Sequence, residues 1–240
     1  MALVWVLAML LVCLAPQVAR AEVNTDHPLI EDTGYILRPK QLKVGLFQSS
    51  YGLTDRIQLD SLLWLNLITY FNLGAKVKVI EDKNLAVAVE AWAGTLAAAL
   101  LTGAAIFNLG TQVDATVPLV DKLKLHLVAG FRYWKISTLP GIDQALLPSG
   151  RIYWPTLKGS VEYDITERHL LFLTLGSPTS WSAGIGNGGH EFDATAFWAI
   201  TAGYQLSYKW LNLRLDLGYG PSLFGRGVVA GLDTYFRFDP

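Results

Sequence analysis

The chain has 240 residues, of which 52% are hydrophobic and only 16% charged, and its mean hydropathy is +0.33. Its 19 Lys and Arg nearly balance its 20 Asp and Glu, so no global field directs the protein to nucleic acid or to an anionic surface. Beyond the N-terminus no apolar run approaches the ~20 residues of a spanning helix, so the hydrophobicity is dispersed over short segments.

The N-terminus has the pattern of an export signal. An apolar stretch leads to Ala19-Arg20-Ala21, a small-residue cleavage motif. This predicts a signal peptide over residues 1–21 and a mature barrel domain over residues 22–240. An uncleaved anchor helix is the alternative, but the apolar run is short for one. The single cysteine, Cys13, lies inside the signal, so the mature chain forms neither a disulfide nor a thiolate metal site.

Alternation between apolar and polar residues runs along the rest of the chain. It is strict at 211–219, where leucines alternate with Asn212, Arg214 and Asp216. A period of two predicts a strand, because successive side chains leave a pleated backbone on opposite sides. A soluble sandwich would also alternate. The polar residues that recur on the minor face favour a closed barrel with lipid outside and a wet or ion-paired interior.

In chain order, the alternation predicts an all-β fold, an antiparallel up-and-down transmembrane barrel of about twelve strands. Ten strands are the alternative, if a weak segment such as 170–175 does not span; an even number is the norm. For the Ala-rich stretch 96–105 we predict a strand end and a short loop, and a helix is the alternative because alanine favours it. The twelve predicted strands are 33–37, 41–47, 57–67, 73–79, 85–95, 107–117, 123–133, 153–163, 170–175, 192–206, 211–219 and 228–238.

The predicted connections sort onto two sides of the barrel. Outer-membrane barrels have short periplasmic turns opposite longer external loops. We therefore expect periplasmic termini and external loops at 135–150 and 177–191. The tight turns fall near 54–55, 81–82, 121–122, 166–167 and 209–210, and the loops at 135–150, 177–191 and 221–226, with a short one near 103.

The polar face of these strands is assigned to the lumen. Eight cations and seven anions fall on it, which argues against a ring of one charge and a strongly ion-selective pore. Four tryptophans at 64, 92, 134 and 154 share this face and favour a constricted lumen. The predicted lumen-lining residues are Lys43, Asp60, Lys76, Lys78, Glu90, Asp114, Lys124, His126, Arg132, Lys158, Glu162, Asp193, Arg214, Asp216, Asp233 and Arg237.

Several residues invite a chemical interpretation. His126 is either a proton-sensitive gate or a histidine hydrogen-bonded inside a polar barrel. His190, Glu191 and Asp193 suggest a metal site, but no helix fixes their spacing. A lipid hydrolase needs an activated serine, and none of Ser160, Ser177, Ser180 or Ser182 lies in a nucleophile motif with His169 or His190 as base. The sequence therefore assigns no catalytic, cofactor or metal residue and predicts a non-enzyme.

The chain closes with Gly231-Leu-Asp-Thr-Tyr-Phe-Arg-Phe238. With the signal motif and the alternating strands, this ending resembles bacterial outer-membrane β-barrel proteins of the porin-like kind, without a named family. The resemblance covers essentially the whole mature chain. It implies a location in the bacterial outer membrane, with outer-membrane lipid and the barrel-assembly machinery, which recognises such aromatic-ended strands, as partners.

The leading functional hypothesis is a narrow porin-like channel for small solutes. The alternatives are a non-conducting structural or ligand-binding barrel and, third, an outer-membrane lipid-modifying enzyme. A soluble lipocalin-like carrier is the competing class, and it would purify without detergent. A barrel between the small filled ones and the large porins can hold either an open or a closed lumen.

Overall fold

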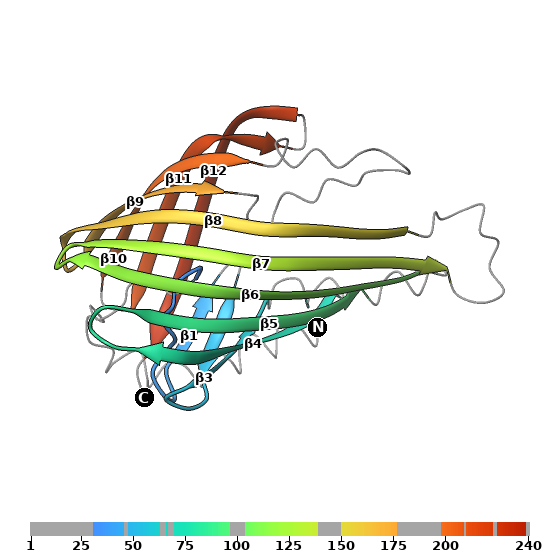
Figure 1. Cartoon of the computed structure of the whole chain (residues 1–240), viewed down its shortest axis with the longest axis horizontal. Helices are drawn as coiled ribbons and strands as arrows, with labels where there is room; N and C mark the ends of the chain where they lie inside the picture. Colours follow the sequence, from blue (N-terminus) through green and yellow to red (C-terminus); the bar gives the residue numbers. More distant parts are fainter. Residues whose placement is uncertain are drawn as a thin grey trace, which may run out of the picture.

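The computed structural model describes residues 31–45, 48–62, 66, 70–96, 104–138, 150–176, 198–208, 210–222 and 225–238. These residues form one closed barrel of twelve antiparallel strands, each paired with its neighbours in sequence, with β1 against β12 (Figure 1). The predicted up-and-down barrel of twelve strands is confirmed. The strands are β1 (Leu42–Gly45), β2 (Ser49–Gly52), β3 (Ile57–Ser61), β4 (Tyr70–Glu81), β5 (Ala86–Leu96), β6 (Ala104–Val120), β7 (Leu123–Thr138), β8 (Gly150–Thr166), β9 (His169–Gly176), β10 (Ala199–Tyr208), β11 (Leu211–Ser222) and β12 (Gly225–Phe238).

The barrel is apolar outside and polar inside. Outward side chains are among the most exposed, such as Leu73 at 61%, Leu217 at 61% and Val228 at 75%. Of the buried residues that the structure describes, twenty are polar or charged and ten are apolar. A soluble barrel has the opposite distribution, because burial of apolar area drives its folding. The observed distribution is typical of a barrel that faces lipid.

The tight turns gather at one end of the barrel, here called the turn end. The registers place them after Gly52, Glu81, Val120, Thr166 and Tyr208, close to the predicted positions. The last strand, β12, also ends at this end, where Phe238 pairs with Leu42 at the start of β1 (Figure 1). The opposite end, here called the loop end, receives the connections after β1, β3, β5, β7, β9 and β11.

The predicted first strand, 33–37, is wrong. These residues have no strand partner; they lie inside the barrel, where the Gly34 N–H donates to Thr116 Oγ1 at 2.8 Å and the Leu37 N–H to Gln58 Oε1 at 2.8 Å. Side chains of the barrel wall thus accept these backbone hydrogen bonds in place of a neighbouring strand. The twelfth strand comes instead from a hairpin, because the stretch predicted as strand 41–47 plus a turn folds into β1 and β2.

Three further predicted bounds change. The strand 57–67 stops at Ser61, because the Asn72 side chain accepts the Leu62 N–H at 2.6 Å and ends the ladder there. The loops 135–150 and 221–226 shorten, because hairpin pairing continues through Lys135↔Arg151 and Ser222↔Gly225. Of the strand predicted at 192–206, residues 192–197 lie outside the described residues. So do loop 177–191, the signal peptide and residues 97–103 of the 96–105 stretch.

The wall is uneven in height. β1 and β2 have four residues and β3 has five, whereas β6 and β8 have 17 and project far beyond them in Figure 1. A spanning strand needs about 9–11 residues, so the short strands do not cross a bilayer by themselves. Among the described residues, no helix is long and apolar enough to cross a membrane.

We expect Leu217→Arg to destabilise the folded barrel in lipid vesicles by about 2–4 kcal/mol, because it places a charge on the lipid face. The control is Thr201→Arg, which puts the same side chain on an inward, partly exposed position of β10. Unfolding in guanidinium, followed by tryptophan fluorescence, measures the free energy of unfolding of both variants. Equal destabilisation by the two variants would contradict the assignment of the faces.

Candidate functional site

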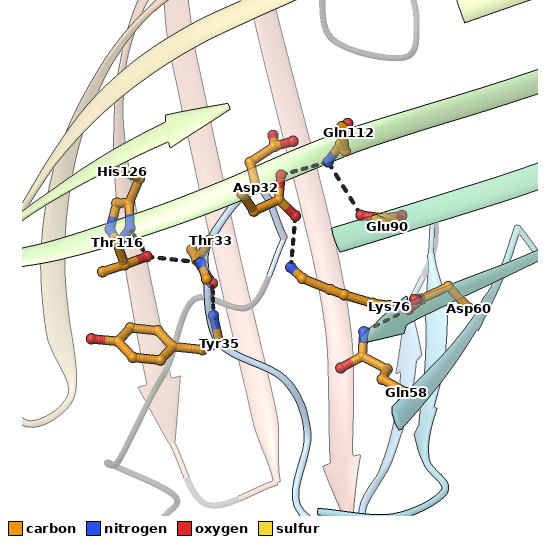
Figure 2. A network of polar contacts seen from close by, with 12 residues as sticks. Asp32, Thr33, Tyr35, Gln58, Asp60, Lys76, Glu90, Gln112, Thr116 and His126 are labelled. Carbon is orange, nitrogen blue, oxygen red and sulfur yellow. Dashed lines mark hydrogen bonds and ion pairs between the residues drawn. The ribbon is translucent and has the colours of Figure 1, made fainter. Parts of the chain in front are cut away.

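The lumen contains part of the chain itself. The inserted segment (residues 31–37) leads into β1, and Thr33 to Leu37 are buried. Figure 2 shows Thr33 and Tyr35 between His126 on one wall and Lys76 on the other. Tyr35 and Leu37 pack with Ala86 of β5 into an apolar cluster. Gly34 lies so close to this wall that a Cβ there would collide with the Ala86 carbonyl.

Two ion pairs hold the N-terminal end of the inserted segment. Asp32 makes an ion pair with Lys158 of β8 at 2.8 Å, and Glu31 makes one with Lys43 of β1. Asp32 has a φ of 57°, a left-handed conformation that aspartate tolerates better than most residues. The segment is therefore attached to opposite sides of the barrel by side chains and backbone N–H groups, without strand pairing.

The charge of Lys158 stabilises the ionised form of the Asp32 carboxyl. Enclosure in the barrel by itself raises the pKa of Asp32, but the charge and hydrogen bond of Lys158 outweigh it and lower the pKa to about 2. Its side chain keeps 39% of its surface exposed, so lumen water screens the pair. Burial also raises the pKa of Tyr35, so this phenol stays neutral at physiological pH.

One network of side chains surrounds Lys76 (Figure 2). Lys76 Nζ lies 3.0 Å from Asp114 Oδ2. The Gln112 amide donates to Asp114 Oδ1 at 2.9 Å and to Glu90 Oε2 at 3.2 Å, so it bridges two carboxylates. Gln58 donates to Asp60 at 2.7 Å. The Lys76–Asp114 ion pair thereby joins β4 to β6 and the Gln112 amide joins β6 to β5, whereas the Gln58–Asp60 contact lies within β3.

A second network runs through His126. Thr116 Oγ1 lies 2.9 Å from His126 Nδ1, and His126 Nε2 lies 3.2 Å from Glu162. Lys124 binds Glu162 at 2.5 Å and Asp164 at 2.8 Å. The order hydroxyl, imidazole, carboxylate resembles a catalytic triad. However, Thr116 has no exposed surface and accepts the Gly34 N–H, so no substrate reaches its oxygen. His126 here is a histidine hydrogen-bonded inside a polar barrel, and it helps to anchor the inserted segment.

The predicted lumen residues occupy inward positions of their strands, except that Asp193 lies outside the described residues. That they line a conducting pore stays a prediction. Trp92 and Trp134 also point inward, whereas Trp64 and the side chain of Trp154 are not described. Buried among the predicted residues are Lys43, Asp60, Lys76, Asp114, His126, Lys158, Glu162 and Arg237; partly exposed are Lys78, Glu90, Lys124, Arg132, Arg214, Asp216 and Asp233.

Exposure of the inward face changes along the barrel axis. At the turn end the inward residues are almost fully buried, as with Gln205 at 0% and Tyr235 at 1%. Toward the loop end the exposure is mixed, because Trp92, Thr201 and Asp216 are partly exposed whereas Asn108 is buried. In the part of the chain that the structure describes, the lumen is thus filled at the turn end and reached by solvent at the loop end.

The closure of twelve antiparallel strands around a polar lumen establishes the fold class. The chain is a closed antiparallel β-barrel with an apolar outer face and a polar lumen. The predicted resemblance is confirmed at the level of the fold. No protein-family model and no curated protein sequence matches the chain.

Among solved structures, the NanC porin matches with 12% identity and a TM-score of 0.45, over 83% of this chain and 99% of that one. The KdgM porin in complex with disordered oligogalacturonate matches with 11% identity and a TM-score of 0.42, over 83% and 96%. The toluene transporter TodX of Pseudomonas putida matches with 10% identity and a TM-score of 0.31, over 82% and 77%. At these values the likeness concerns the general architecture only.

The other chemistry considered from the sequence is not assembled in the described residues of this barrel. No group of three His, Cys, Asp or Glu side chains there is placed to hold a metal ion. Ser160 pairs with Thr174 at 2.6 Å, and His169 binds the Tyr204 hydroxyl, so the two do not meet. The remaining candidates, Ser177, Ser180, Ser182, His190 and Glu191, lie outside the described residues.

Sequence reasoning missed the inserted segment and the neutral side chains that receive it. Thr116 and Gln58 lie among the inward charges, but nothing in a period-two pattern marks them as the groups that bind this segment. The available signal was length, since five residues at 33–37 are too few for a spanning strand of about 9–11. An alternating stretch this short cannot span the membrane as a strand of the wall, so another position in the fold is expected for it.

We expect Lys76→Met to destabilise the barrel strongly, because it leaves the Asp114 carboxylate buried without its cation. Breaking a buried pair in this way costs about 3–5 kcal/mol. Lys76→Met/Asp114→Asn removes both charges and keeps the Gln112 contact, so most of the loss should be recovered. Urea titration of the detergent-folded barrel, followed by the heat-modifiable gel band, measures the free energy of unfolding of each variant. A double variant as unstable as the single one would show that the pair is unimportant.

Proposed function

We propose that the protein is an outer-membrane channel for small solutes, closed in the described conformation by the inserted segment. The observation that carries the proposal is the contrast along the lumen. Solvent reaches the inward face at the loop end, while the turn end is filled by a few residues held without strand pairing. Such a segment can leave without breaking the wall, since the β1–β12 ladder closes the barrel independently of it.

Barrel size supports a conducting state. Barrels of about eight strands are filled by their own side chains, whereas those of 16 or more hold an aqueous channel. Twelve strands lie between these limits, and here a chain segment is needed to fill the turn end. The near-balance of inward charge supports weak selectivity by sign. The outer-membrane location rests on the apolar outer face and the predicted export signal.

Planar-bilayer recordings of the mature chain, refolded in detergent and shown to be heat-modifiable on a gel, test this function. We expect long closed periods interrupted by discrete current steps, and a higher open fraction when the inserted segment is loosened. Continuous silence in all such variants would overturn the channel.

The second candidate is a non-conducting barrel that binds a ligand from outside. Closure of the lumen at the turn end favours it, because a tube open at one end is a pocket. The two candidates differ in one measurement, which is whether loosening the inserted segment produces current.

A further inference from the structure

The solvated half of the lumen contains an arginine held by aromatic side chains. The Arg132 guanidinium on β7 lies 5.0 Å from the centre of the Trp92 ring on β5. Trp92 itself lies flat on the wall, because the position beside it is Gly110, where a Cβ would collide with the indole. Glycine thus lets the ring lie along the sheet, and the ring supports the planar guanidinium.

Arg132 lacks a carboxylate partner within the described residues. Its Nε is buried and makes no hydrogen bond there. The acidic groups whose charges reach it are occupied elsewhere: Asp32 is paired with Lys158 at 2.8 Å, and Glu90 accepts from Gln112 at 3.2 Å. The arginine across the lumen is different. Arg214 also lies over a ring, Phe172, but is paired with Asp216 at 3.0 Å.

Flat surfaces flank the arginine. Tyr70 and Trp134 are stacked, with ring centres 6.3 Å apart and planes 14° from parallel, and Asn108 holds the Tyr70 hydroxyl. Tyr70, Trp92 and Trp134 are all partly exposed to the lumen. Across the barrel, the inward positions of β11 and β12 include glycines at 218 and 231, which add no side chain opposite the aromatic wall.

We propose that this region binds a small carboxylate carried on a flat ring. The carboxylate accepts two parallel hydrogen bonds from the two terminal Nη groups of Arg132, and the ring lies beside Tyr70 and Trp134. A guanidinium presents its donors in a planar fork that matches a carboxylate, and charge-assisted pairs of this kind are the strong ones. Stacking on Trp92 holds the fork in place before the ligand arrives, which lowers the ordering cost of binding. The inference names the solute class of the proposed channel and rests on that function for its physiological meaning.

Calorimetric titration of the full mature barrel in detergent tests the site without requiring conductance. The probes are benzoate, the neutral isostere benzamide and inorganic phosphate. We expect benzoate to bind and benzamide to bind at least about 10-fold more weakly. Arg132→Gln should weaken benzoate binding by about 10- to 100-fold, and Arg132→Lys should give an intermediate loss, because lysine keeps the charge but not the fork.

The matched control is Arg214→Gln/Asp216→Asn, which removes the paired arginine with no change in net charge. It should change the Kd for benzoate by less than about 3-fold, which is well below the tenfold change expected for Arg132→Gln. Absence of benzoate binding by a heat-modifiable wild-type barrel would overturn the site, as would equal losses in the Arg132 variant and the control. Phosphate binding as tight as benzoate binding would overturn the role of the ring. Channel function is judged separately by current, so a failed site and a failed channel are distinguishable.

Discussion

Gly34→Ala is expected to open the barrel. At this position a Cβ collides with the Ala86 carbonyl, which belongs to the wall and cannot rotate away like a side chain. Overpacking of this kind costs about 1–3 kcal/mol. Because the cost falls only on the docked segment, it shifts the equilibrium toward the undocked state by roughly 5- to 150-fold. In bilayer recordings the ratio of open to closed time should rise by this factor, with the size of single steps unchanged.

Gly227 provides the matched control for that experiment. It lies on β12, and a Cβ built there meets no heavy atom within 4 Å. Gly227→Ala therefore makes the same chemical change in open space and should leave the open fraction at the wild-type value. If Gly34→Ala behaves like Gly227→Ala, the inserted segment does not control the lumen. If both barrels lose heat-modifiability, the glycines serve folding and the closure mechanism fails.

Acid is expected to loosen the inserted segment through Asp32. Its pKa is lowered from 3.8 to about 2 in the docked state, so the docked state binds the proton less well than the undocked one. The contribution of the pair is therefore complete above pH 3.8 and is lost as the pH falls toward 2. Bilayer current should rise as the pH falls through this window.

Asp32→Asn separates this residue from the other carboxylates that titrate in acid. It leaves Lys158, which is 8% exposed, without its counter-ion, and the loss of a hydrogen bond to a charged group costs about 1–3 kcal/mol. Lumen water reaches the Asp32 side chain, so the lower part of that range is expected. The variant should conduct more at neutral pH, and its current should rise less between pH 4 and pH 2 than that of the wild type.

Glu81→Gln is the control for the acid experiment. Glu81 pairs with Lys78 at 2.6 Å, but this pair lies beside the turn between β4 and β5 and both side chains are partly exposed. Removing its charge should leave the neutral current and the acid response unchanged. Superimposable pH profiles for the wild type and Asp32→Asn would exclude Asp32 from closure.

The alternating stretches show why so much of the barrel was predictable. At 211–219 each leucine faces outward and each polar residue inward, as the pattern requires, because a strand offers its side chains only two directions. Strand ends were less predictable. Pro221 and Gly225 read as loop residues, yet they belong to β11 and β12, because a neighbouring strand supplies hydrogen bonds regardless of local preference.

By itself, the sequence determined the fold class, the apolar outer face, the polar inner face and the end at which the tight turns gather. All of these follow from local periodicity and turn chemistry. Only the tertiary structure decided that 33–37 runs inside the barrel, that Asp32 meets Lys158 and that Arg132 has an aromatic support and, among the described residues, no carboxylate partner. These contacts join residues far apart in the chain, from 40 positions between Trp92 and Arg132 to 126 between Asp32 and Lys158. A two-residue period carries no information about which strands face each other across a lumen.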